Sequence, residues 1–286
     1  MSIVVTGATG ALGSLVIEEL LATVPAGRIT ALVRDADKAA GLAARGVVVK
    51  VADYDRPETL AAAFQAGDRV LLISGNAVGR RIPQHLAVIE AAREAGVAQF
   101  AYTGILGGPE ADFELAAEHR ATEDAVLAAG LPYTFLRNGW YHENYTVSVA
   151  AAVSNGAVVG STAGGRIASA ARADYAAAAA AVLTGDVADH LGRAYELSGD
   201  RAWSLDEYAA EVAAQSGTAV AHSDLPATAH LEVLKHNGLP EDFAGILVDV
   251  DAAIARGLLS RSNGDLARLI GRPTTPVAEA IAAALA

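Results

Sequence analysis

The length and composition of the chain predict a globular protein of one large domain or two small ones. It has 286 residues, of which 52% are hydrophobic and 19% are charged, so it has the material for a packed core. The net charge of −12 argues against nucleic acid as a partner, because binding a phosphate backbone takes clustered Lys and Arg. Without cysteine the chain has no disulfide, thiolate metal ligand or cysteine nucleophile.

The apolar runs predict no membrane-spanning segment. The longest run, 175–183, is far shorter than the roughly 20 residues that a spanning helix needs. The first six residues lack the basic start of a signal peptide and predict a strand. We therefore expect a soluble, cytoplasmic protein with no membrane partner.

Short apolar strands alternate with helices over the first half of the chain. Strands are predicted at 3–6, 28–33, 47–52, 69–74, 99–103 and 133–137. Helices are predicted from the turn after the first strand to residue 22, and at 36–44, 57–64, 83–95 and 110–129. This alternation is typical of βαβ units and predicts an α/β fold with a doubly wound parallel sheet, covered on both faces.

The pattern changes after Arg137. A polar, aromatic stretch at 138–145 and a glycine-containing stretch at 155–166 precede an alanine-rich helix at 173–183 and a short strand at 194–197. Further helices are predicted at 205–215, 229–236 and 241–256 and after Pro276. We predict a first domain at 1–140, to which 168–200 return, and a smaller, mainly helical lobe made of 141–167 and 201–286.

A glycine-rich turn follows the first strand and opens a helix. Its residues are Gly7, Ala8, Thr9, Gly10, Ala11, Leu12 and Gly13, with the spacing G-x-x-G-x-x-G. The first glycine permits a tight turn, the second lets a pyrophosphate approach the helix N-terminus, and the third allows the helix to pack closely on the strand. The spacing predicts a dinucleotide site; a purely structural turn is the alternative.

The end of the second strand bears on which dinucleotide binds. Arg34 follows the strand and Lys38 comes one turn later, and both could bind a ribose 2′-phosphate, which favours NADP. Asp35, next to Arg34, would favour NAD if it were presented instead. A solvated surface cation is the alternative for Arg34.

Two other loops follow strands at the same edge of the predicted sheet. Asp53 and Tyr54 follow the third strand, where an adenine edge would lie. Ser74 and Gly75 follow the fourth, where the backbone would approach ribose and nicotinamide. Open α/β sheets bind ligands at the carboxyl ends of their strands.

Longer motifs resemble one family. The glycine turn, Arg34, Tyr102-Thr103, the run 136–145 (LRNGWYHENY), 168–175 (ASAARADY) and 269–275 (LIGRPTT) resemble the NmrA-like atypical short-chain dehydrogenases along essentially the whole chain. Within that family they are most similar to the bacterial NAD(P)H:quinone oxidoreductases. The RNGWY run is the specific part of the match.

The resemblance implies a Rossmann-type NADP-binding domain and a substrate lobe, with the nicotinamide in the cleft between them. The expected cofactor-binding residues are Gly7, Thr9, Gly10, Ala11, Leu12, Gly13, Arg34, Lys38, Ser74, Gly75, Asn138 and Trp140. Asn144, His142 and Arg172 are expected to contact substrate. The family also includes redox-sensing regulators that bind a dinucleotide without turnover.

The Tyr-x-x-x-Lys pair of ordinary short-chain dehydrogenases is missing: none of the eight Tyr is followed by Lys four residues later. Reducing a simple ketone leaves an alkoxide, a base comparable to hydroxide, and therefore needs a positioned acid. Reducing a quinone leaves a phenolate, whose conjugate acid has a pKa of about 10, so hydrogen-bond donors suffice. The missing pair fits hydride transfer to a quinone, and equally fits no catalysis.

Several side chains are candidates for the chemistry. Asn144 could donate its amide N–H to a quinone oxygen and Tyr141 could stack beside it, so these two are the catalytic candidates; loop capping and packing are the alternatives. His142 could be a proton source. His119 is expected to face solvent or cap a turn, His222 and Asp224 to lie in a poorly ordered stretch, and Asp249 and Asp251 to form an exposed helix face.

The sequence as a whole predicts an NADPH-dependent reductase of a quinone or similar flat, polycyclic aromatic carbonyl compound. NADPH is expected in preference to NADH, with neither flavin nor metal. The alanine-rich composition suggests a variant in aromatic polyketide tailoring, in which a dihydroquinone passes to a partner oxygenase. The alternative is an NADP(H)-binding redox sensor without turnover. A third hypothesis is a reductase of dyes or other conjugated electrophiles.

Overall fold

The predicted strands form one seven-stranded sheet in a computed structural model, which describes residues 2–286. The strands are β1 (Ile3–Thr6), β2 (Ile29–Val33), β3 (Val48–Val51), β4 (Arg69–Leu72), β5 (Gln99–Ile105), β6 (Tyr133–Asn138) and β9 (Arg193–Leu197). Their order is β3-β2-β1-β4-β5-β6-β9, and every neighbouring pair from β3 to β6 is parallel. The α/β, doubly wound fold is thus confirmed.

The strand order reverses between β1 and β4. The chain builds outward from β1 through β2 to β3, then returns to place β4 on the other side of β1, with Val5 opposite Leu71. The loops that leave the carboxyl ends of β1 and β4 therefore diverge at neighbouring positions. In open α/β sheets a ligand binds at such a point of reversal.

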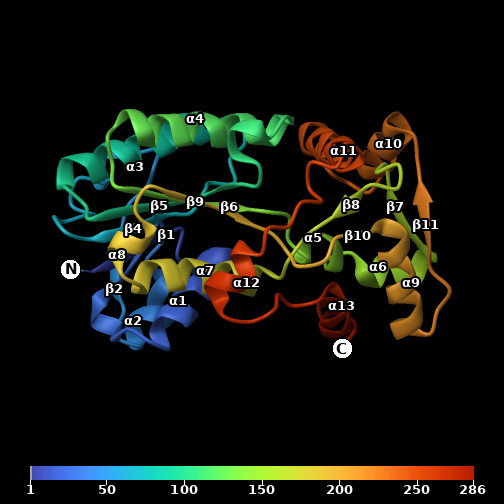
Figure 1. Cartoon of the computed structure of the whole chain (residues 1–286), viewed down its shortest axis with the longest axis horizontal. Helices are drawn as coiled ribbons and strands as arrows, with labels where there is room; N and C mark the ends of the chain where they lie inside the picture. The colour runs from blue at the N-terminus through green and yellow to red at the C-terminus, as the bar shows by residue number, and fades with distance from the viewer. Residues whose placement is uncertain (1) are drawn as a thin grey trace. The chain divides into compact units, whose positions relative to one another are not determined.

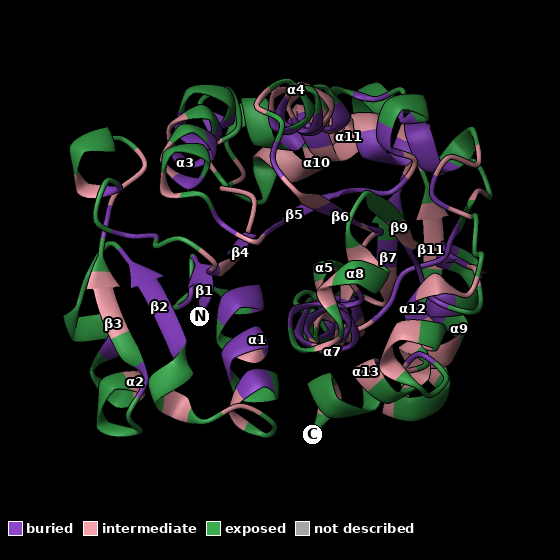
Figure 2. Cartoon of the chain, turned by 60° about the vertical axis from the view of Figure 1, so that its left-hand side comes forward, coloured by how far each residue is buried: buried purple, intermediate pink, exposed green. Residues whose placement is uncertain are grey.

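Helices cover both faces of the sheet. Figure 1 shows α3 (Arg81–Ala95) and α4 (Glu114–Ala128) on one face, and α1 (Ala11–Leu21), α2 (Ala40–Ala44) and α7 (Arg172–Thr184) on the other. Every residue of β1, β2 and β5 is buried as a result, whereas the edge strand β3 is partly exposed (Figure 2). These strands are short apolar runs because both of their faces must be apolar.

The chain forms two compact units. Unit 1 comprises Met1–Gly108, Glu118–Asn138 and Ala173–Tyr195, and unit 2 comprises Pro109–Ala117, Gly139–Arg172 and Glu196–Ala286. Unit 1 also has α8 (Val187–His190) and the short 3₁₀ helices Ala26–Arg28, Asp37–Ala39 and Pro57–Thr59; a further 3₁₀ turn is Gly108–Glu110. No helix among residues 2–286 has both the length and the apolar character needed to cross a bilayer.

Unit 2 has two small sheets and seven helices. β7 (Ala157–Gly160) pairs in parallel with β11 (Ala221–Asp224), and β8 (Arg166–Ile167) pairs antiparallel with β10 (Trp203–Ser204). The helices are α5 (Glu143–Thr146), α6 (Val149–Asn155), α9 (Leu205–Ser216), α10 (Ala227–His236), α11 (Glu241–Ala255), α12 (Asp265–Ile270) and α13 (Val277–Leu285). The division predicted from the sequence, with this part as the substrate lobe, stays a prediction.

The helix predicted at 57–64 is wrong. Only Pro57–Thr59 forms a 3₁₀ turn, and separate turns follow. The Thr59 hydroxyl donates to the Arg56 carbonyl and accepts from the Asp53 N–H, while Lys50 Nζ donates to the Ala62 and Ala63 carbonyls. The Thr59 hydroxyl thereby binds the Arg56 carbonyl, the first acceptor that the predicted helix would use.

Two expectations for unit 2 are also wrong. His222 and Asp224, predicted in a poorly ordered stretch, lie in β11, which the short pattern at 221–224 did not reveal. Asp251 is buried instead of exposed, because its carboxylate accepts hydrogen bonds from the N–H and hydroxyl of Ser161. A buried carboxylate needs such partners.

The close approach of α1 to the turn before it yields a prediction. A Cβ on Gly13 would lie 2.2 Å from the Gly7 carbonyl oxygen, whereas a Cβ on Gly41, in α2, would meet nothing within 4 Å. We expect Gly13→Ala to lower the free energy of unfolding by about 1–3 kcal/mol, and Gly41→Ala to leave it unchanged or raise it by up to about 1 kcal/mol. Urea unfolding followed by circular dichroism measures both; equal stability of the two variants would contradict the close approach.

Candidate functional site

The glycine turn leaves the N-terminus of α1 open. Gly7 has a φ of 58°, and the Gly10 N–H donates to the Gly7 carbonyl at 2.9 Å. Gly10 caps α1 without a side-chain hydrogen bond, and the first turn of the helix has no acidic residue. The first N–H groups of the helix therefore have no intrahelical partner, and the positive end of its dipole is not neutralised locally.

The turn lies beside the loop that leaves β4. The Ile73 N–H donates to the Thr6 hydroxyl at 3.0 Å, which ties the ends of β1 and β4 together. The Ser74 N–H donates to the Thr103 hydroxyl of β5 at 2.8 Å. The structure thus brings the predicted residues Gly7 and Ser74 to one edge of the sheet.

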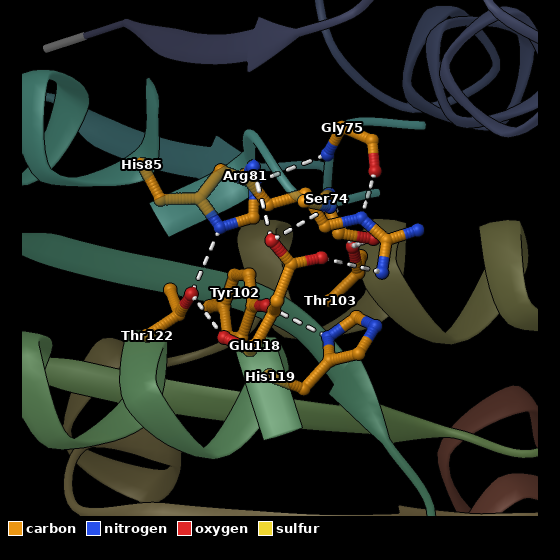
Figure 3. A network of polar contacts seen from close by, with 10 residues as sticks. Ser74, Gly75, Arg81, His85, Tyr102, Thr103, Glu118, His119 and Thr122 are labelled. Carbon is orange, nitrogen blue, oxygen red and sulfur yellow. Dashed lines mark hydrogen bonds and ion pairs between the residues drawn. The ribbon is translucent and has the colours of Figure 1, made fainter. Parts of the chain in front are cut away.

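Buried side chains of α3 form hydrogen bonds with both backbone polar groups of Gly75 (Figure 3). The Gly75 N–H donates to His85 Nε2 at 3.1 Å, and Arg81 Nε donates to the Gly75 carbonyl. The Thr122 hydroxyl donates to the Glu118 carbonyl at 2.8 Å, so His85 Nδ1, 2.9 Å from that hydroxyl, is the donor to it. His85 is therefore neutral, with its proton on Nδ1.

A second histidine lies in the same buried cluster. His119 Nδ1 is 2.7 Å from the Tyr102 hydroxyl, and both residues are buried. The expectation that His119 faces solvent or caps a turn is thus wrong, because α4 directs this residue toward β5. Burial, assisted by the nearby Arg81 cation, lowers the pKa of His85 to about 4 and that of His119 to about 3, and burial raises the pKa of Tyr102.

Two cations follow β2 without ion-pair partners. Arg34 and Lys38 are exposed, and neither forms an ion pair or a side-chain hydrogen bond with any of residues 2–286. The Asp35 carboxylate accepts from the Asp37 N–H at 3.0 Å and so is engaged in its own turn. Burial raises the pKa of Tyr54, which follows β3, and the positive charge of Arg34 opposes this increase. The Arg34 guanidinium therefore lies near Tyr54.

The aromatic run after β6 is built into unit 2 by backbone pairing. The Ala170 N–H donates to the Trp140 carbonyl at 3.2 Å, and the His142 N–H donates to the Ala170 carbonyl at 2.9 Å. The Arg172 guanidinium lies over the Tyr141 ring, 4.9 Å from its centre. The structure therefore brings Tyr141 and Arg172 together as a flat, charged surface.

His142 is buried with both ring nitrogens in hydrogen bonds. The Trp203 Nε1–H donates to the Ser169 hydroxyl, whose own proton is then directed to His142 Nδ1 at 2.8 Å. His142 Nε2 accordingly donates to the Thr275 carbonyl at 2.9 Å. This geometry suits a residue that holds the 140–145 segment in place better than it suits a proton source.

Asn144 and Asn138 differ in accessibility. Asn144 lies in α5 and is exposed, and its carboxamide makes no hydrogen bond within residues 2–286. Asn138 is buried at the end of β6, in unit 1, and Trp140 is half-buried. The roles assigned to these residues from the sequence stay predictions.

The sequence analysis missed Arg81, His85, Glu118 and Thr122. The Glu118 carboxylate accepts from the Gly79 and Arg81 N–H groups at 3.1 and 3.2 Å, which fixes the loop before α3. These residues come from two helices that are adjacent only in the folded chain. Their sequence signal is a set of polar positions, such as Arg81 and His85 in α3 and Thr122 in α4, on helix faces that are buried in the folded chain.

The edge formed by β1, β2 and β4 fits a dinucleotide. Gly13 leaves empty the space in which a Cβ would collide with the Gly7 carbonyl, so the helix can start close to the turn. The helix N-terminus is open to an anion, and unpaired cations follow β2. These features define a dinucleotide-binding α/β protein. A family model described as NAD(P)H-binding matches residues 7–186, and the chain belongs to this family, the NmrA-like oxidoreductases.

Similar proteins match over the whole chain. Quinone oxidoreductase 2 of Escherichia coli is 47% identical over 279 residues, which are 98% of this chain and 97% of that protein. A crystal structure of the NADPH-dependent quinone oxidoreductase of Escherichia coli with NADPH has a TM-score of 0.95 at 46% identity, covering 98% and 99% of the two chains. The triphenylmethane reductase of Citrobacter sp., complexed with NADP(H), has a TM-score of 0.94 at 40% identity, covering 99% and 100%.

The two buried histidines predict an acid-sensitive fold. Their folded-state pKa values of about 4 and about 3 lie below the ordinary 6.5, so the unfolded chain binds more protons once the pH falls below about 6.5. We expect the free energy of unfolding to fall from there toward pH 4, by up to about 1.4 kcal/mol per pH unit for each histidine. Urea unfolding at several pH values measures the slope. His119→Gln should reduce it, and an unchanged slope would show that His119 is not neutral in the folded protein.

Proposed function

We propose that this protein is an NADPH-dependent reductase that acts on quinones or similar flat conjugated carbonyl compounds. The observation that carries the proposal is the pair of unpaired cations, Arg34 and Lys38, at the strand end beside the glycine turn. A ribose 2′-phosphate is the group that distinguishes NADPH from NADH, and a guanidinium binds it with two parallel hydrogen bonds. The Escherichia coli relative, matched by sequence and by structure, is named as a quinone oxidoreductase, which supports the substrate class.

Unit 1 provides the cofactor contacts. The open N-terminus of α1, with Gly7, Thr9, Gly10, Ala11, Leu12 and Gly13 around it, would receive the pyrophosphate, and Arg34 with Lys38 would receive the 2′-phosphate. Ser74 and Gly75 follow β4 and Asn138 ends β6, at the same edge of the sheet, and these residues would contact the remainder; the role expected for Trp140, two residues after Asn138, stays a prediction. Asp35 is held in its own turn, which leaves Arg34 as the group offered to the ribose.

The chemistry needs little proton transfer from the protein. NADPH supplies a hydride, which carries two electrons, and a quinone that takes the hydride and one proton becomes a hydroquinone. The oxygen that gains charge is phenolate-like, with a conjugate-acid pKa of about 10, so hydrogen-bond donors can stabilise it and water can protonate it. The exposed Asn144 carboxamide would donate to that oxygen, beside the face made by Tyr141 and Arg172.

The other hypotheses from the sequence have less support. The relatives that match the whole chain are named as enzymes, so a sensor without turnover is not favoured. Reduction of dyes shares the hydride step, and the triphenylmethane reductase makes it the second substrate class to test. The role in aromatic polyketide tailoring and the partner oxygenase stay predictions, as do the expectations of no flavin and no metal.

The first experiment follows the loss of reduced nicotinamide absorbance with purified protein, NADPH or NADH, and a panel of quinones. We expect oxidation that depends on quinone and prefers NADPH. Arg34→Ala should lower kcat/KM for NADPH by about 10-fold or more and leave that for NADH nearly unchanged, because only NADPH loses a charge-assisted contact. Arg28→Ala, which removes an exposed arginine next to the other end of β2, is the matched control.

Two results would contradict this proposal. NADPH binding without oxidation on any quinone or dye would leave a binding protein in place of a reductase. Equal losses for NADPH and NADH in the Arg34 variant would show that Arg34 does not recognise the 2′-phosphate.

Asn144 is tested separately. We expect Asn144→Ala to lower kcat/KM for the quinone by about 10-fold while the Kd for NADPH stays the same, because the amide would act on the substrate oxygen alone. Asn155→Ala, which removes another exposed asparagine of unit 2, should change neither value. If Asn144→Ala retains full kcat/KM for every active quinone, the substrate role is wrong.

A further inference from the structure

The Gly75 peptide is held from the protein side through both of its polar groups. Its N–H donates to His85 Nε2, and its carbonyl accepts from Arg81 Nε (Figure 3). A donor and an acceptor that are already engaged inward offer little to a ligand outside. Any contribution of Gly75 to dinucleotide binding must therefore come from the position of its backbone.

The acceptor for the Gly75 N–H exists only while His85 is neutral with its proton on Nδ1. Thr122 enforces this state, since its hydroxyl donates to the Glu118 carbonyl and can only accept from His85 Nδ1. Arg81 stands on the same helix, and the Tyr102 ring meets the His85 ring edge-on at 5.6 Å. Burial and the nearby cation both work against protonation of this imidazole.

The rest of the loop is fixed by the same two helices. Glu118 of α4 accepts from the Gly79 and Arg81 N–H groups and lies 3.8 Å from the Arg81 guanidinium. Arg81 and Glu118 are nearly buried, with side chains 9% and 14% exposed. The 75–81 loop is therefore held at Gly75 and again at Gly79–Arg81 by groups that water reaches poorly, which makes its position a property of the protein without ligand.

This loop leaves β4, directly beside the β1 turn that would hold the pyrophosphate. The Ile73 N–H to Thr6 hydroxyl bond and the Ser74 N–H to Thr103 hydroxyl bond fix where the loop starts. The bonds from Gly75 to His85 and from Arg81 to Gly75 then hold the next residue after Ser74. Both the N–H and the hydroxyl of Ser74 are hydrogen-bonded to the Thr103 hydroxyl, and the next peptide N–H, that of Gly75, is bound to His85.

We propose that His85 is a positioning residue for dinucleotide binding, which, together with Arg81, clamps the Gly75 peptide so that the Ser74–Gly75 turn is set before the cofactor arrives. The proposal rests on the proposed function, because it concerns the same cofactor. Without the clamp the turn would populate other conformations, and the apparent Kd would rise in inverse proportion to the competent fraction. His85 itself touches neither cofactor nor substrate.

The test compares two substitutions of His85 in the full chain. Gln can place its amide oxygen near the position of Nε2 and so can accept the Gly75 N–H, whereas Leu leaves that N–H without a partner. We expect His85→Leu to raise the Kd of both NADPH and NADP⁺ by about 10-fold or more, and His85→Gln to stay within about 3-fold of the wild type. Titration of protein fluorescence with cofactor measures Kd without any turnover.

The control removes a buried hydrogen bond elsewhere in unit 1. The Thr134 hydroxyl donates to the His190 carbonyl at 2.9 Å from the amino half of β6. Thr134→Val should reduce stability by an amount similar to the effect of His85→Leu and leave the Kd for NADPH unchanged. A general loss of stability that weakened binding by itself would affect both variants alike.

Kinetics separate a positioning role from a catalytic one. His85→Leu should raise the KM for NADPH while kcat at saturating NADPH and the KM for quinone stay near the wild-type values. If His85→Leu does not fold, Thr122→Val provides the test, because it frees the His85 tautomer and should raise the Kd for NADPH several-fold.

The results that overturn the proposal are distinct from those that overturn the proposed function. Wild-type affinity in a folded His85→Leu variant, or in Thr122→Val if that variant is the one used, overturns it, and so does an equal loss of affinity in His85→Gln and His85→Leu. A wild-type protein that does not bind NADPH overturns the proposed function, and this proposal with it. Quinone reduction by the wild type together with unaltered binding in His85→Leu overturns the positioning role alone.

Discussion

The close approach of the β1 turn to helix α1 is the contact on which the candidate site depends. A Cβ at position 13 would lie 2.2 Å from the Gly7 carbonyl and 2.9 Å from the Ala8 Cα, so the helix can begin where it does only with glycine there. That start places the uncapped end of α1 beside the loop that leaves β4. The reversal of strand order between β1 and β4 then opens the sheet edge at this same place. Anion binding follows from the position of the helix, since the free N–H groups belong to the backbone.

The two loops that flank this edge are shaped in opposite ways. At β1 the absence of side chains lets the backbone turn tightly, whereas at β4 buried polar side chains hold a loop that could otherwise move. Arg81 of α3 and Glu118 of α4 lie 3.8 Å apart beside this second loop, and His85 stays neutral there because burial and the Arg81 cation lower its pKa. Burying such groups costs free energy, which their ion pair and their hydrogen bonds to the loop backbone must offset. As a result, we expect the loop after β4 to keep the same position in the absence of ligand.

The sequence predicted the parts of this structure that depend on local pattern. The sheet strands through β6, the glycine turn and Arg34 could be found because each follows from a short run of residues with its own stereochemistry. The clamp on Gly75 could not be found, since His85 and Thr122 lie 37 positions apart and meet only after α3 and α4 have packed. Asp251 was misjudged for a similar reason: its partner Ser161 lies 90 positions earlier. The helix expected at 57–64 is replaced by turns, in which the Thr59 hydroxyl binds the Arg56 carbonyl and the distant Lys50 binds the Ala63 carbonyl.

The step on which the proposed function depends is the transfer of a hydride from bound NADPH to a quinone. The most direct test uses NADPH that carries deuterium at the reactive ring carbon on one face or on the other, with one active quinone and no added flavin, and analyses the NADP⁺ product by mass spectrometry. We expect oxidation that requires the quinone, with the deuterium fully lost from one labelled cofactor and fully retained from the other, because a cofactor bound in one orientation presents a single face. NADPH that binds but is not oxidised would contradict hydride transfer to the quinone, and equal loss of deuterium from both faces would contradict a cofactor bound in one orientation.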